Sequence, residues 1–96
     1  MTSHLRLHTS DFTLQTSQFR LTEFMRAERL VSMANDIGAF WAAEPDKNEA
    51  ARNVASHLTR FWDPRMRRQI VAHYREGGGG LNDIVRSAVA MLAESN

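Results

Sequence analysis

The chain has 96 residues, of which 43% are hydrophobic and 24% are charged, and its formal net charge is +1. This length allows a single domain, and this composition is typical of globular rather than disordered proteins. The absence of cysteine excludes a disulfide framework, a thiolate zinc site, a cysteine nucleophile and cysteine ligation of an iron–sulfur cluster by this chain.

No apolar run in the sequence approaches the roughly 18–20 residues that a membrane-spanning helix needs. The first residues lack the basic start, the apolar stretch and the small-residue cleavage site of a secretion signal. We therefore expect a cytoplasmic protein without a membrane span.

Residues 1–21 are rich in Ser, Thr, Gln and His, with apolar residues at irregular intervals. A short alternation of apolar and polar residues is strand-like, but a single strand has no partner here. We predict a flexible N-terminal arm over residues 1–21, followed by a single helical domain over residues 22–94.

Residues 22–43 show the three- and four-residue spacing of a helix. Two apolar stripes run along it, which gives a wider apolar surface than a small bundle usually covers. One consists of Phe24, Ala27, Val31, Ala34, Gly38 and Trp41, and the other of Leu30, Met33, Ile37 and Phe40. Glu44-Pro45 should end this helix, because the residue before proline is disfavoured in the α conformation.

Asp46 is predicted to cap a second helix, with Glu49 as its capping-box partner. The predicted buried stripe of this helix is Ala51, Val54, Ala55, Leu58, Phe61 and Trp62. Asp63-Pro64 then predicts a third helix to about Arg75, because aspartate is a good N-cap and proline suits the first helical position.

A run of four glycines, residues 77–80, should end the third helix, and Asn82 should cap a fourth. The inner face of this last helix is predicted to be Val85, Ala88, Val89 and Leu92. The sequence thus predicts an all-α fold: a small bundle of about four helices with a flexible N-terminal arm.

Two features could suggest chemistry but favour structural interpretations. The glycine run lacks the preceding strand and the following Lys-Ser or Lys-Thr of a phosphate loop, so a flexible helix end and linker is favoured. The four histidines, at positions 4, 8, 57 and 73, are scattered, and no cysteine could complete a metal site. We predict no catalytic, cofactor-binding or metal-binding residue in this chain.

The junction Phe61–Arg68 is the strongest candidate for binding, because it places arginines beside two aromatic residues. Guanidinium groups suit carboxylates or phosphates, so the ligand could be an acidic protein surface or a nucleic acid. The near-neutral net charge and the wide apolar surface of residues 22–43 favour a protein. The alternative is a small arginine-rich helical nucleic-acid-binding module.

The sequence resembles the delta subunit of soluble NAD-dependent formate dehydrogenases that contain molybdenum or tungsten. The similarity spans roughly residues 28–92. Its main motifs are Leu30-Val31-Ser32-Met33-Ala34-Asn35-Asp36-Ile37-Gly38-Ala39-Phe40, Val54-Ala55-Ser56-His57-Leu58 and Phe61-Trp62-Asp63-Pro64-Arg65-Met66-Arg67; Ala72-His73, the glycine run into Leu81, Val85-Arg86 and Ala88-Val89 follow. Relatives often carry proline near position 83, where this chain has Asn82-Asp83, and the arm has no counterpart in the family.

The resemblance implies a non-catalytic accessory subunit that docks on the large catalytic subunit and supports assembly or stability of the complex. In such a complex the partner subunits would carry the molybdenum or tungsten cofactor, iron–sulfur clusters, FMN and NAD. The residues predicted to contact the partner are Met33, Asn35, Phe40, Phe61, Trp62, Arg65, Met66, Arg67 and Arg68.

Overall fold

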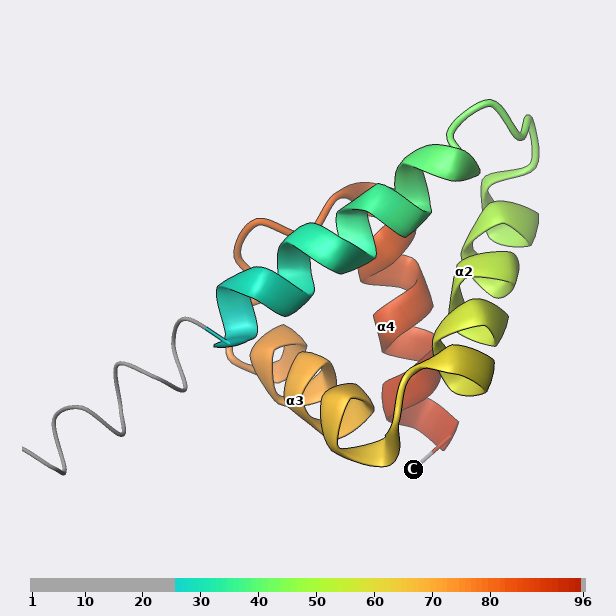
Figure 1. The fold of residues 1–96 in the computed structure, drawn as a ribbon. Coiled ribbons are helices and arrows are strands. Elements are labelled where there is room, and N and C mark those ends of the chain that lie inside the picture. The colour runs from blue at the N-terminus through green and yellow to red at the C-terminus, as the bar shows by residue number, and fades with distance from the viewer. Residues whose placement is uncertain (1–25, 96) are drawn as a thin grey trace, which may run out of the picture.

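The computed structural model describes residues 26–95, and within this range the chain is all-α. The first helix is described over residues 26–40, and it is followed by α2 (Lys47–Phe61), α3 (Pro64–Arg75) and α4 (Asp83–Ser95) (Figure 1). The predicted fold class and number of helices are therefore confirmed. The predicted N-terminal arm, residues 1–21, lies outside the described residues. No helix within the described range is long and apolar enough to cross a membrane.

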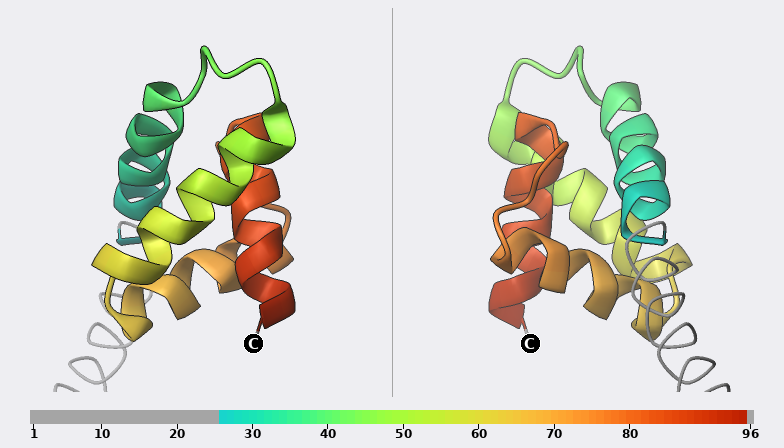
Figure 2. Two further views of the ribbon diagram at one scale, coloured as in Figure 1. Left: turned by 90° about the vertical axis from the view of Figure 1, so that its right-hand side faces the viewer. Right: turned by 90° about the vertical axis from the view of Figure 1, so that its left-hand side faces the viewer.

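The helices share one apolar core, with α4 packed against both α2 and α3. Figure 2 shows α3 crossing the end of the bundle at which α2 and α4 both finish. The fully buried side chains include Val54, Leu58, Ile70, Val85 and Val89, and no polar or charged residue is buried in the described part of the chain. The predicted inner face of the last helix is confirmed.

The first helix ends at Phe40, three residues earlier than predicted. The amide of Trp41 donates to the carbonyl of Gly38, and the amide of Ala42 donates to that of Ala39. These bonds span three residues rather than four, so the chain tightens into a turn before it reaches Pro45.

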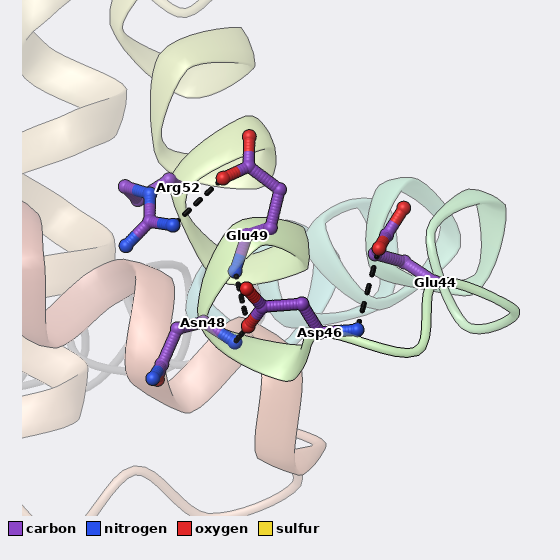
Figure 3. A network of polar contacts seen from close by, with 5 residues as sticks. All are labelled: Glu44, Asp46, Asn48, Glu49 and Arg52. Atoms are coloured by element: carbon purple, nitrogen blue, oxygen red, sulfur yellow. Dashed lines mark hydrogen bonds and ion pairs between the residues drawn. The ribbon is translucent and has the colours of Figure 1, made fainter.

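Only half of the predicted capping box at the start of α2 forms (Figure 3). The carboxylate of Asp46 accepts hydrogen bonds from the amides of Asn48 and Glu49, as an N-cap should. The Glu49 side chain does not bond back to the amide of Asp46 but pairs with Arg52 at 2.7 Å. The hydrogen bond to Glu49 and the negative charge of Glu49 raise the pKa of Arg52. Glu44 accepts from the Asp46 amide instead.

The caps predicted for the last two helices are confirmed. Asp63 accepts a hydrogen bond from the amide of Met66 at 2.9 Å, and Pro64 is the first residue of α3. The side-chain oxygen of Asn82 accepts from the amide of Val85, also at 2.9 Å. Each cap satisfies an amide at the helix start that has no partner within the helix.

The predicted buried stripe of α2 is wrong at Phe61, which is 70% exposed, whereas Trp62 is only 5% exposed. Trp62 has left the helical conformation (φ −88°, ψ 139°) while its amide still donates to Leu58. This change of backbone direction turns the indole into the core. Phe61, the last helical residue, remains on the surface.

The first helix approaches α4 closely at Gly38, because a Cβ atom there would lie 2.6 Å from Cγ2 of Val85. Alanine normally stabilises a helix relative to glycine, but at position 38 its methyl group would push apart two packed helices. We therefore expect Gly38→Ala to lower the free energy of unfolding by about 1–2 kcal/mol, measured by urea denaturation.

Gly79→Ala is the matched control, because no atom lies within 4 Å of a Cβ at that position and its φ is not left-handed. The control should be neutral or more stable by about 0.5 kcal/mol. Equal stabilities of the two variants would contradict the close packing inferred at Gly38.

Candidate partner-binding site

The glycine loop, residues 77–80, closes α3 with a Schellman motif. The amide of Gly78 donates to the carbonyl of His73, and the amide of Gly77 donates to that of Tyr74. Gly77 has φ +121° and Gly78 has φ +65°, a conformation that residues with a side chain rarely adopt. The loop therefore depends on glycine for its backbone path.

Side chains from three helices hold the carbonyl groups of this loop. Asn35 of the first helix donates to Gly80 at 2.8 Å and accepts from the amide of Asn82 at 3.1 Å. A ring nitrogen of His73 lies 2.8 Å from the carbonyl of Gly79, and Arg86 of α4 donates to the carbonyls of residues 77 and 78. The loop is thus a tethered element, not the flexible linker that the sequence predicted.

Arg67 fastens the corner between α2 and α3. Its Nη1 donates to the carbonyl of Thr59 at 3.0 Å and to the carbonyl of Trp62. Carbonyls at the end of a helix lack partners within the helix and carry the negative end of its dipole, so a guanidinium there is favourable. Arg67 therefore acts as a C-terminal cap for α2.

The exposed side chains at this corner form a cluster that we call the basic corner: Arg60, Phe61, Arg65 and Arg68. None of its three guanidinium groups pairs with a carboxylate in the described part of the chain. The ring of Phe61 stacks against His57 with 4.7 Å between centroids, which supports the aromatic side chain on the surface. An exposed aromatic residue among arginines is typical of protein interfaces.

Two large apolar side chains of the first helix are also exposed. Met33 is 37% exposed and Phe40 is 82% exposed, the latter in an edge-to-face contact with Trp41. A shallow groove of about 300 Å³ separates the first helix from α3, and it is lined by Arg26, Arg29, Leu30, Met33, Asp63, Arg65, Met66 and Gln69. This groove joins the exposed methionine to the basic corner.

The predicted contact residues divide into two groups. Met33, Phe40, Phe61, Arg65 and Arg68 are exposed. Asn35, Trp62, Met66 and Arg67 interact within the chain, since Trp62 belongs to the core and Met66 packs against it.

The predicted set of contact residues omitted three residues that shape this surface or hold it in place. Arg60 completes the basic corner, and its position one residue before Phe61 was a usable signal. The roles of His73 and Arg86 in holding the glycine loop had no sequence signal, because their partners are backbone carbonyls.

No group of three or more potential metal-ligating side chains occurs among residues 26–95. Of the two histidines in this range, His57 contacts the ring of Phe61 and His73 contacts the glycine loop.

The fold and this surface together define a small all-α protein with an exposed aromatic and basic face of the kind used to bind other proteins. The family model for the NADH-dependant formate dehydrogenase delta subunit FdsD matches residues 29–89. The chain therefore belongs to the formate dehydrogenase delta subunit family, as the resemblance predicted. Comparison with curated proteins and with solved structures gave no significant match.

We expect Asn35→Ala to destabilise the protein by about 1–3 kcal/mol, because it removes two hydrogen bonds, to Gly80 and from the Asn82 amide, each worth about 0.5–1.5 kcal/mol. Hydrogen exchange of the Asn82 amide should accelerate as well. Asn35→Asp keeps the acceptor but loses the donor, so its exchange rate at Asn82 should be intermediate. Ser32→Ala, an exposed change on the same helix, is the control; an equal effect there would contradict the tether.

Trp62→Ala and Phe61→Ala should separate core from surface. Truncating the buried indole should cost about 3–5 kcal/mol of unfolding free energy. Truncating the exposed phenyl ring should change it by about 0.5 kcal/mol or less. Thermal unfolding followed by circular dichroism measures both, and similar losses would show that the assignment of the two side chains is wrong.

Proposed function

We propose that this chain is a non-catalytic accessory subunit of a cytoplasmic, NAD-dependent formate dehydrogenase that contains molybdenum or tungsten. It docks on the large catalytic subunit and supports assembly or stability of the active complex. The observation that carries this proposal is the family match over residues 29–89.

The internal contacts of the chain support a non-catalytic role. The side chains best suited to acid–base chemistry near neutral pH are histidines, and the two described ones already contact a phenyl ring and a loop carbonyl. The chain has no cysteine with which to hold an iron–sulfur cluster. In this proposal the metal cofactor, the clusters, FMN and NAD belong to the partner subunits.

The proposed contact surface consists of the exposed members of the predicted set: Met33, Phe40, Phe61, Arg65 and Arg68. Phe40 and Phe61 have most of their surface in solvent, although burying a side chain of this size is worth about 1.5–3 kcal/mol. An interface that covered them would recover that free energy. Asn35, Trp62, Met66 and Arg67 support this surface from within the fold.

Docking would stabilise the catalytic subunit by mass action. A partner that binds only the folded, cofactor-loaded form shifts the equilibrium toward that form, by about 2.7 kcal/mol at a hundredfold excess over Kd. A small subunit without chemistry of its own can therefore raise the amount of active enzyme.

The test is co-expression of the affinity-tagged chain with the remaining subunits of the formate dehydrogenase. We expect the large subunit to co-purify with the tag. Omitting the chain should lower the molybdenum or tungsten content and the formate-oxidising activity of the purified enzyme. Full cofactor content, activity and thermal stability without the chain would contradict the supporting role.

We expect Phe61→Ala to weaken co-purification of the large subunit, because the variant removes an exposed anchor while the fold is retained. Ser56→Ala, an exposed change on the same helix, is the matched control. If Phe61→Ala co-purifies the large subunit as fully as the control does, Phe61 is not part of the interface.

A further inference from the structure

α3 places positive charge where a helix is least suited to it. The helix contains four arginines and no acidic residue, and Arg65, Arg67 and Arg68 all fall within its first five residues. The amino end of a helix carries the positive end of its dipole, so cations there are unfavourable. Some other interaction should compensate for each of these arginines.

For Arg67 the compensating interaction lies within the chain, at the carbonyls that end α2. Arg65 and Arg68 are exposed and have no carboxylate partner among the described residues. The nearest acid in sequence, Asp63, already accepts a hydrogen bond from the amide of Met66. Neither guanidinium group is neutralised within the described part of the chain, so both are available to pair with carboxylates of a partner.

A recess of about 440 Å³ lies beside Arg68, while Arg65 lines the groove between the first helix and α3. Its lining consists of Pro64, Arg67, Arg68, Val71, Ala72 and Arg75, which are three apolar residues and three arginines with no carboxylate. An element that entered the recess would meet an apolar wall flanked by guanidinium groups. Guanidinium forks bind carboxylates in a bidentate manner, which sets the direction as well as the strength of the contact.

We propose that Arg65, Arg68 and this recess bind an acidic segment of the large catalytic subunit, with Asp or Glu side chains around an apolar anchor. This inference rests on the docking function proposed above and names the chemistry of the partner surface. The near-neutral net charge of +1 favours an acidic protein over nucleic acid, because small nucleic-acid-binding domains are usually strongly basic overall.

The test compares the full-length chain with the double variant Arg65→Gln/Arg68→Gln, which removes two charges without adding repulsion. Binding to the purified large subunit is titrated at about 0.05 M and 0.5 M NaCl, because screening separates charge pairing from apolar contact. We expect the double variant to bind roughly tenfold more weakly at low salt. We also expect it to lose most of the salt dependence that the unmodified chain shows.

Arg52→Gln is the matched control, since Arg52 is an exposed arginine that pairs with Glu49 on α2. It should bind like the unmodified chain, and circular dichroism should show unchanged helix content in all variants. Tight binding of the unmodified chain combined with equally tight binding of the double variant would overturn the acidic segment but leave docking intact. No binding of the unmodified chain would overturn both. Binding of a single-stranded oligonucleotide by the unmodified chain, together with no binding of the large subunit, would show that the arginines bind nucleic acid instead.

Discussion

The buried face of α4 is the constraint on which the other helices depend. Val85, Ala88 and Val89 have no exposed surface, and α4 packs against both α2 and α3. The first helix reaches α4 only because Gly38 presents no side chain to Val85. In a chain this small, one well-filled interior must supply most of the stability, so a change in the position of α4 would affect every other helix.

The features that the sequence predicted correctly are local ones. Asp63 and Asn82 cap the amides that follow them within three residues, and a short polar side chain before a helical pattern is sufficient to reveal this. The inner face of α4 follows from helical spacing alone. The family resemblance also rested on blocks of consecutive residues, and the family match over residues 29–89 confirmed it.

The features that the sequence did not predict depend on contacts between distant residues or on backbone direction. Asn35 forms hydrogen bonds with Gly80 and Asn82, which lie more than 40 residues away in the sequence. Arg67 reaches Thr59 because the chain turns between α2 and α3. Helical spacing placed Phe61 in the core because spacing alone does not show at which residue a helix ends. The sequence also did not distinguish Arg67, which caps α2, from Arg65 and Arg68, which face solvent, because the same residue type serves both roles. The structure separates them, and it leaves Arg65 and Arg68 for external contact.

The glycine loop has a consequence for how members of this family can vary. Surface loops usually accept insertions, because the entropy of closing a loop rises slowly with its length. Here the carbonyls of all four residues, 77–80, are held by side chains from the first helix, α3 and α4. One added or deleted residue would move each carbonyl away from its partner and shift the start of α4. We therefore expect the length of this loop to be a fixed feature of related chains, even where the residues around it differ.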